Sequence, residues 1–454
     1  MTEQALHSSI EHLHGPEEVD YDPDELVVVC NVRDGRPYVK SFVEHYRSLG
    51  VKHLFFLDNN STDGTVEALQ TYNNITVLRS KLPFKEYDVP FKQYLIARFG
   101  MKDRWCLCAD IDELFDYPYS DVIGLGSLLG YLTEKSYTAV AAQMLDMFPE
   151  EPLSGREGNL EDEPLKERHR FYDISNLKRV SIKKNPRLRN NTLQSDEIET
   201  FRNGIDNTVF GTEPLRTKFP LVFTDGTIKP FDRSSHWVDN AKIADISCVL
   251  FHYKFLDGYF QKRTVQAVQE ENHYKNSRGA KKHLEVLDKN STLQLKRDTA
   301  RELKGVNDLV ENWFLVVSEE YLMMVYEEEE RKSADHTPLR GDRIGLEDEA
   351  AALYRARAQA KVQTLRAHRL EQQLQKLRKQ ELLQPNPSVE KLREQDHREV
   401  ERLSTRLARV RKQNRTLRQS NRTLTQQLQS IRASRSVRLL NKLGRIRARM
   451  LGRG

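Results

Sequence analysis

The sequence predicts an α/β fold, in the form of a doubly wound sheet followed by long C-terminal helices. Two observations support this class. Short β-branched runs alternate with segments of helical periodicity from Glu25 to Phe115, and near the C-terminus apolar residues recur at intervals of three and four. The chain has 454 residues, enough for one large domain and an accessory region.

The alternation begins at residues 25–30, a continuous β-branched run that is typical of a strand buried on both faces. Apolar residues at helical spacing follow over 38–49, and Gly50 ends that helix. The same reasoning predicts further strands at 51–57, 75–79 and 105–109, with helices at 65–72 and 90–99. Since ligands bind at the carboxyl ends of strands in such a sheet, we expect residues 31–33 and 110–113 there.

The remaining segments complete a predicted α/β domain over 24–330. Residues 1–23 are polar and are predicted to be a disordered leader. The stretch 150–235 is rich in Pro, Gly and Asn, which indicates loops and short strands on the acceptor side. A strand is expected at 249–253 and helices from 257 to 330, then a linker at 331–347 and a helical segment at 348–383.

Residues 390–433 carry the most regular periodicity in the chain. Apolar or Asn side chains alternate by four and three without interruption, which predicts a coiled-coil seam: Leu403, Leu407, Val410, Asn414, Leu417, Asn421, Leu424, Leu428 and Ile431. Buried Asn at core positions favours a parallel dimer, so we expect a homodimer. Pro385 and Pro387 separate this helix from the preceding one.

Charge is distributed unevenly. The net charge is +5, yet from Ala351 onward 27 Lys and Arg face 7 Asp and Glu. Residues 434–454 combine an apolar stripe with flanking arginines, which predicts a basic amphipathic helix on an anionic membrane surface. A DNA-binding zipper has its basic region before the heptads, and here the order is reversed, so no nucleic acid partner is expected.

Localisation follows from what the sequence lacks. No stretch is long and apolar enough to span a bilayer, and the N-terminus lacks the pattern of a signal peptide. Four cysteines in so long a chain indicate a reducing compartment: Cys30, Cys106, Cys108 and Cys248. We therefore expect a cytoplasmic protein, peripheral on the inner face of the cytoplasmic membrane.

The first motif with chemical potential is Asp110-Ile-Asp112-Glu113, directly after an apolar strand. Two aspartates separated by one residue can project to one side and bind a divalent cation that bridges a diphosphate. A solvated acidic turn is the plain alternative. The position of the motif at a strand end favours the metal site.

The second motif is the loop from Asp58 to Thr65. Ser61 or Thr62 can cap the next helix, and Gly64 permits a tight turn. Asp58, at the carboxyl end of a strand, is in addition a candidate acceptor for a hydrogen bond from a nucleotide base.

Together these segments resemble the family 2 glycosyltransferases, which have the GT-A fold, of the bacterial surface-polysaccharide type. The resemblance covers Val28 to Leu69 and Trp105 to Phe115, and more loosely Val249 to Phe255. It implies donor binding by Asn31, Arg33, Asp58 and Asp110, and binding of Mn²⁺ or Mg²⁺ by Asp110 and Asp112. The chain departs from the family in having Asp58-Asn-Asn-Ser where Asp-Asp-Gly-Ser is usual.

The reaction expected from this resemblance moves a sugar from a nucleoside-diphosphate-sugar donor to an acceptor hydroxyl on a surface glycan or lipid-linked precursor, with inversion. Asp146 is the candidate catalytic base, with Glu197 and Glu199 as weaker candidates. His252 is a candidate metal ligand, against the alternative of a core histidine. Two other classes stay open: a nucleotidyltransferase, and a non-catalytic coiled-coil scaffold with a degenerate GT-A domain.

Overall fold

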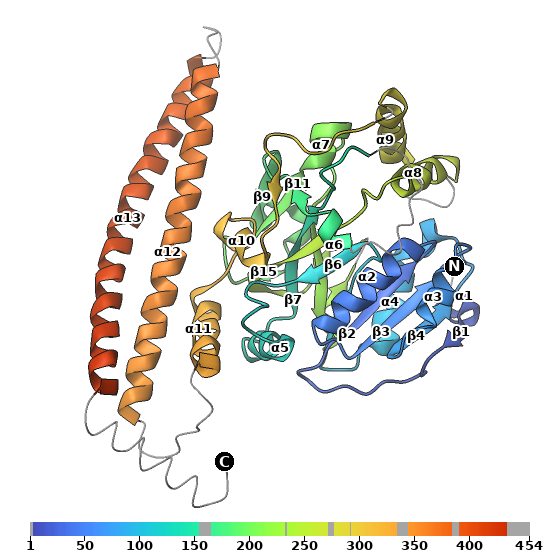
Figure 1. Ribbon diagram of the computed structural model, residues 1–454, viewed down its shortest axis with the longest axis horizontal. Coiled ribbons are helices and arrows are strands. Elements are labelled where there is room, and N and C mark those ends of the chain that lie inside the picture. The colour runs from blue at the N-terminus through green and yellow to red at the C-terminus, as the bar shows by residue number, and fades with distance from the viewer. Residues whose placement is uncertain are drawn as a thin grey trace, which may run out of the picture. The chain divides into compact units, whose positions relative to one another are not determined.

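The structure is a computed structural model that describes residues 3–153, 165–231, 234–270, 277–290, 292–333, 344–383 and 390–433. The chain divides into two compact units, one of residues 1–309 with 314–316 and one of residues 310–313 with 317–454. The first unit is built on a large mixed sheet and the second consists of helices (Figure 1). The predicted α/β class with C-terminal helices is thereby confirmed.

The predicted alternation forms the first half of the sheet. Strands β2 (Val27–Val32), β3 (His53–Asp58), β4 (Ile75–Arg79) and β5 (Trp105–Cys108) are parallel, in the order β4-β3-β2-β5. The helices between them are α2 (Arg36–Ser48), α3 (Thr65–Leu69) and α4 (Phe84–Phe99). Helix α4 begins at Phe84 instead of residue 90, because Pro90 lies inside the helix rather than in its first turn.

Helices cover this half of the sheet on both faces. Neighbouring residues of a strand point to opposite faces, and β3 shows this clearly: Phe55 stacks on Phe99 of α4 with ring centroids 3.9 Å apart, whereas Phe56 packs against Phe42 of α2 at 5.6 Å. All six residues of β2 and of β3 are accordingly buried. Strands buried on both faces explain the continuous apolar runs of the sequence.

The second half of the sheet is mixed. Strand β12 (Thr217–Phe223) lies antiparallel between β5 and β7 (Ala139–Asp146), and β15 (Lys242–His252) continues the sheet parallel to β7. Strand β6 (Glu113–Asp116) pairs antiparallel with β15. The start of β12 therefore lies at the same edge as the carboxyl ends of β5, β7 and β15, where the candidate site is built.

The N-terminal residues differ from the prediction of a disordered leader over 1–23. Residues Glu3–Ser9 form helix α1, and β1 (Glu11–His14) pairs antiparallel with β4. Strand β1 covers an edge of β4 that would otherwise expose unpaired backbone groups. Leu6 and Tyr21 are buried in the same apolar core as α4.

The rest of the first unit contains short elements, as expected for 150–235. They are α5 (Leu125–Glu134), α6 (Leu165–Arg168), β8 (Phe171–Tyr172), β9 (Leu177–Ser181), β10 (Thr192–Leu193), β11 (Glu199–Asn203), α7 (Ile205–Phe210), β13 (Lys229–Pro230), β14 (Val238–Asp239), α8 (Tyr259–Gln269), α9 (Ser277–Lys289), β16 (Arg301–Glu302) and α10 (Val306–Glu311), with 3-10 turns at Ile182–Lys184 and Pro186–Leu188. Helices α8 and α9 contribute to a second apolar core with Phe148, Phe210 and Phe255.

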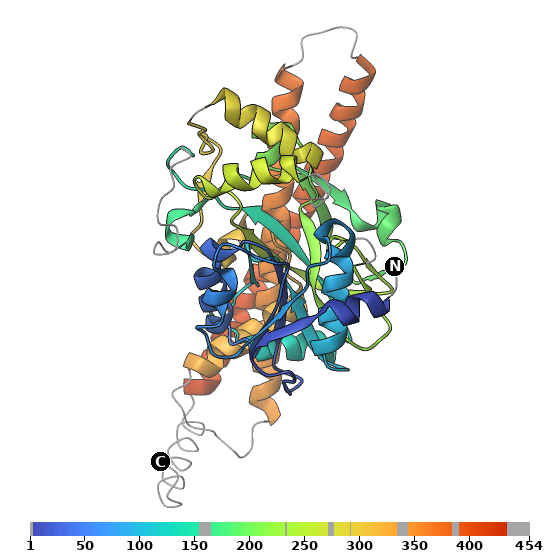
Figure 2. The ribbon, with the colours of Figure 1, turned by 90° about the vertical axis from the view of Figure 1, so that its right-hand side faces the viewer.

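The helical unit contains α11 (Glu319–Ser333), α12 (Ile344–Leu383) and α13 (Glu390–Ala433). Because α11 packs on α12, the α/β unit ends before α11 and not at the predicted residue 330. Helices α12 and α13 lie side by side in both views (Figure 2). Thr364 contacts Asn414 and Glu371 contacts Arg411, at 2.8 Å each, so the numbering runs in opposite directions and the hairpin is antiparallel.

The predicted seam of α13 packs on α12 of the same chain. Three of its apolar positions form a buried cluster with α12, consisting of Leu403, Leu407 and Val410 against Ala367, Leu370 and Leu374. Asn414, the next seam residue, donates a hydrogen bond to Thr364. A parallel homodimer through these positions stays a prediction, and it would have to displace α12 from them. The predicted basic helix at 434–454 lies outside the described residues.

The four cysteines are buried free thiols. Within the described ranges, no helix combines the length and apolar character needed to cross a membrane.

His45 is a buried histidine whose pKa departs from its usual value. It is 4% exposed, and its ring nitrogens lie 2.6 Å from the Phe115 carbonyl oxygen and 2.7 Å from Lys166 Nζ. Burial, aided by Lys166, lowers the pKa of His45 to about 3. Since the unfolded chain protonates this group near pH 6.5, its contribution to stability is complete above that pH and is lost as the pH falls.

We predict that the free energy of unfolding drops between pH 7 and pH 5, with at most about 2 kcal/mol of the loss due to His45. Urea titrations of wild type and His45→Gln at both values measure this. The variant should be less stable at pH 7 and should show a smaller loss at pH 5. An equal loss in both proteins would mean that His45 is not the group responsible.

Candidate functional site

The Asp-X-Asp-Glu turn after β5 supplies two members of an acidic cluster. Ligand atoms of Asp112, Glu113 and His252 lie within 4.8 Å of one another. Strand register explains the meeting, because Glu113 of β6 is the direct partner of His252 at the end of β15. The structure thus brings together Asp112 and His252, which were predicted as metal ligands, and adds Glu113. Glu113 could have been found from the sequence because it directly follows Asp112 in the same acidic motif.

Asp110 does not belong to this cluster, contrary to its prediction as a metal ligand. Its two carboxylate oxygens lie 2.8 Å from Lys92 Nζ and 2.6 Å from Lys218 Nζ. Although burial acts in the opposite direction, these ammonium groups hold the pKa of Asp110 far below its usual value. Lys218 also lies 2.6 Å from Glu113, so it bridges the first and last carboxylates of the motif. Sequence reasoning missed both lysines.

Each carboxylate around the turn faces a basic group. Lys92 lies between Asp88 and Asp110, Lys218 lies between Asp110 and Glu113, and Asp112 faces the imidazole of His252. Burial, together with neighbouring carboxylates, raises the pKa of Glu113. Two carboxylates with a neutral imidazole are a ligand set that suits Mn²⁺, and a bound cation would take the place of the proton on His252. The residues present therefore fit such a metal.

His252 connects the acidic cluster to Asp146. Its Nε2 lies 3.4 Å from Asp112, and its Nδ1 lies 2.6 Å from Asp146 Oδ1. Burial by itself would lower the pKa of His252, but the two carboxylates outweigh it and raise the pKa to about 9. Asp146 is the register partner of His252 on β7, so the sheet itself fixes this contact.

Asp146 does not fit the predicted role of catalytic base. Its side chain is 4% exposed, and Arg216 lies 2.8 Å from one carboxylate oxygen and 2.5 Å from the other. Arg216 and Lys254 outweigh burial and lower the pKa of Asp146. A carboxylate so enclosed and so well paired has no free oxygen for an acceptor hydroxyl. Its contact with His252 makes it a positioning group instead.

Arg216 extends this network to a second buried carboxylate. Arg216 pairs with Asp206 at the start of α7. Asp206 also pairs with Lys254, and its carboxylate lies 3.2 Å from His283 Nε2. Arg216 and both aspartates have side chains at most 4% exposed. The site is therefore anchored to α7 through buried ion pairs, and to α9 through the contact of His283, none of which sequence reasoning anticipated.

The weaker candidates for the base lie near β11. Glu197 is in the turn before this strand, and Glu199 begins it, with its carboxylate 3.8 Å from Arg179. Neither is part of the group of metal-ligand side chains found among the described residues. The catalytic base is not assigned to any of the three predicted residues.

The loop after β3 contains Asp58, which was predicted to contact a nucleotide base. Asp58 is completely buried, accepts the backbone N–H of Ser61 at 3.1 Å, and pairs with Arg79 at 3.0 Å. In this structure Asp58 holds the loop, and its contact with a nucleotide base stays a prediction.

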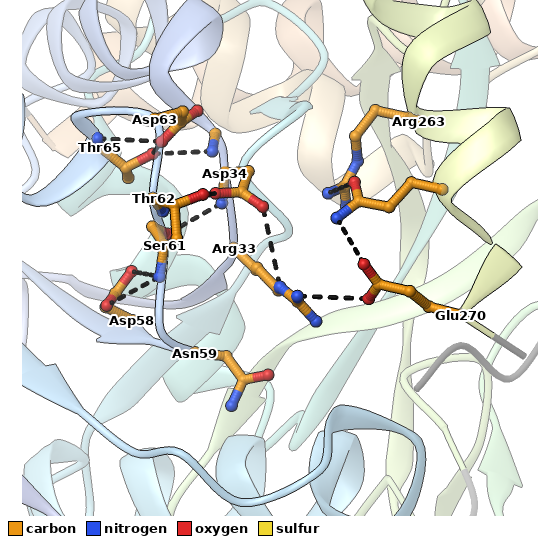
Figure 3. Close-up of polar contacts among 12 residues, drawn as sticks. Arg33, Asp34, Asp58, Asn59, Ser61, Thr62, Asp63, Thr65, Arg263 and Glu270 are labelled. Atoms are coloured by element: carbon orange, nitrogen blue, oxygen red, sulfur yellow. Dashed lines mark hydrogen bonds and ion pairs between the residues drawn. The ribbon is translucent and has the colours of Figure 1, made fainter. Parts of the chain in front are cut away.

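The loops after β2 and β3 interlock (Figure 3). The Asp34 carboxylate accepts the N–H of Thr62 at 2.7 Å, and the N–H of Asp34 donates to Ser61 Oγ at 2.8 Å. The N–H of Gly35 donates to Thr65 Oγ1 at 2.8 Å. Reciprocal hydrogen bonds of this kind fix the position of one loop relative to the other.

Polar atoms without a hydrogen-bond partner gather at these loops. Asn31 and Asn59 donate through their amide nitrogens to backbone carbonyls, while the Oδ1 atoms of both accept nothing from the described residues. Arg33 is ion-paired with Glu270 at 3.2 Å, yet its buried Nη1 has no such partner. Buried polar atoms are normally satisfied, so these point to a polar ligand.

Arg216 offers a test of how far the buried ion pairs stabilise the fold. Arg216→Met leaves Asp146 and Asp206 without their guanidinium partner, and we predict a loss of about 3–5 kcal/mol in the free energy of unfolding. Urea titration measures it. Arg170→Met is the matched control, because Arg170 pairs with Glu150 and Glu302 at the surface and should change stability little. Similar losses in both variants would contradict the argument.

The chain was compared with known proteins. No protein-family model matches it, and no curated protein sequence matches it significantly. What the site does must accordingly be inferred from its own residues.

Proposed function

We propose that the protein is a metal-dependent glycosyltransferase of the GT-A type, which moves a sugar from a nucleoside-diphosphate-sugar donor to an acceptor hydroxyl. One observation carries the proposal: the acidic cluster of Asp112, Glu113 and His252 lies at the same sheet edge as the interlocked loops after β2 and β3. Ligands of open α/β sheets bind at this edge.

In a glycosyltransferase of this type, the residues of the site would bind the donor and the metal. Asn31 and Arg33 contribute the free polar atoms that would contact the donor. Asp112, Glu113 and His252 would hold a divalent cation, which when bound stabilises the charge of a leaving diphosphate. Lys92 and Lys218 keep Asp110 ionised and fixed beside the cluster. The family resemblance implies the same roles for Asn31, Arg33 and Asp112, and a surface glycan or lipid-linked precursor is the expected acceptor.

The first experiment measures thermal stabilisation by a panel of nucleoside diphosphates, with and without Mn²⁺. We predict that one diphosphate stabilises the protein in the presence of the metal, by about 2.7 kcal/mol at 100 times its dissociation constant. Asp112→Asn and Glu113→Gln should abolish this stabilisation. Asp196→Asn is the control, since Asp196 is 75% exposed and, among the residues that the structure describes, is ion-paired only with Lys183, and it should respond like wild type.

The outcomes separate the proposal from its alternatives. No response of folded protein to any nucleotide would favour the non-catalytic scaffold. Release of pyrophosphate from a nucleoside triphosphate and a sugar phosphate would favour a nucleotidyltransferase. Stabilisation that does not depend on the metal would contradict the role given to the acidic cluster.

A second prediction concerns Asp146 as a positioning residue. Its hydrogen bond fixes His252 with Nε2 facing Asp112, and loss of such a partner typically weakens metal binding 10- to 100-fold. We expect this loss in Asp146→Ala, and a smaller one in Asp146→Asn, which retains an acceptor oxygen. Titration of free Mn²⁺ by electron paramagnetic resonance measures the affinity.

Asp245→Asn is the matched control for this prediction. Asp245 is another buried carboxylate, on β15, and it accepts hydrogen bonds from Tyr131. Its variant should lower stability without changing Mn²⁺ affinity. Equal affinity losses in the Asp146 and Asp245 variants would show that the effect is only structural.

A further inference from the structure

Helix α13 presents a row of arginines along one side. The row consists of Arg411, Arg415, Arg418 and Arg422, which are spaced by four, three and four residues. This spacing places about one arginine on the same side of the helix in each turn. All four are exposed. We call this row the arginine flank. The apolar seam of α13 faces α12, so the flank lies beside the contact between the two helices and not within it.

The flank borders a groove of about 360 Å³ between the helices. Arg411, Arg415 and Arg418 line the groove from α13, and Thr364, His368 and Glu371 line it from α12. Glu371 pairs with Arg411 at 2.8 Å, and it is the only acidic residue among the described groove residues. Three of the four flank arginines have no carboxylate among the ion pairs recorded for the described residues, so the flank carries a strong local positive charge.

Sequence around the flank adds no compensating charge. Arg402 to Arg422 contains eight basic residues, all exposed, and no Asp or Glu occurs from Arg402 to the C-terminus. Clusters of four to eight such residues attract anionic lipid, each contributing on the order of 1 kcal/mol near the surface. Because the four arginines lie on one side of the helix, all of them can contact the headgroups of a flat bilayer at the same time.

The side chains of α13 distinguish among anionic partners. Single-stranded nucleic acids are usually bound by aromatic side chains on which bases stack, and α13 has no Phe, Tyr or Trp. Leu403, Leu407 and Val410 pack against α12, so the flank offers charge and no aromatic stacking surface. Charge alone fits headgroups of an anionic bilayer.

We propose that the arginine flank is a docking surface for an anionic lipid bilayer. It extends membrane contact from the predicted helix at 434–454 to a surface of the described hairpin. The proposal does not depend on the glycosyltransferase reaction, and a failure of nucleotide binding would leave it intact.

The test is co-sedimentation of the full chain with vesicles of phosphatidylcholine containing phosphatidylglycerol, and with vesicles of phosphatidylcholine alone. We expect binding to the anionic vesicles that weakens as salt increases. The double variant Arg415→Gln/Arg418→Gln should lower the partition coefficient roughly 30-fold. Circular dichroism verifies that the helical content is unchanged.

The matched control is Arg406→Gln/Arg409→Gln. It removes two exposed arginines of the same helix, and at 100° per residue they lie on the side opposite to Arg415 and Arg418. We expect a change of about threefold or less, because these residues face away from the bilayer. Equal losses in the two double variants, or equal binding to neutral vesicles, would overturn the proposal. So would tight binding to RNA without binding to anionic vesicles.

Discussion

The bridging of Asp110 and Glu113 by Lys218 is the contact on which the rest of the site depends. Two carboxylates of one short turn cannot be kept close in a buried place unless a cation lies between them. Lys218 Nζ lies 2.6 Å from each. Lys92 plays the same part between Asp88 and Asp110, and Arg216 between Asp146 and Asp206. Acidic and basic groups therefore alternate along the sheet edge.

This alternation depends on the antiparallel strand β12. Arg216 directly precedes β12 and Lys218 lies within it, and residues two apart project to the same face of a strand. One strand thus delivers two cations, one to the Asp110 turn and the other to Asp146. The group of Asp112, Glu113 and His252 lies beside this alternation and offers two carboxylates and an imidazole, the set that we propose holds the metal.

The sequence allowed the strands and part of the site to be predicted, for physical reasons that can be named. Strand 75–79 was predicted with the bounds it has, since buried parallel strands give continuous apolar runs. Asp112 and His252 were expected at strand ends, and they meet. The turns of α4 before Pro90, which carry Asp88, were missed because Pro usually marks a first turn.

The roles of Asp58, Asp110 and Asp146 could not be predicted in the same way. Each was recognised as a carboxylate at a strand end, but its role depends on the cation that faces it. Arg79 faces Asp58, Lys92 faces Asp110 and Arg216 faces Asp146. Each cation is 18 or more residues away from its carboxylate along the chain. No local pattern marks a lysine or arginine as buried, so the prediction of burial has to come from the packed fold.

The helical hairpin shows the same limit of periodicity. The heptad pattern of α13 predicts an apolar face correctly, and Leu403, Leu407 and Val410 do pack as a row. The pattern does not identify the partner of that face. Only six residues separate α12 from α13 along the chain, which gives α12 an effective concentration that a second chain reaches only in the millimolar range. An intrachain partner of suitable length therefore competes well for the seam, and the charged residues that a dimer would place along its edges are left facing the solvent.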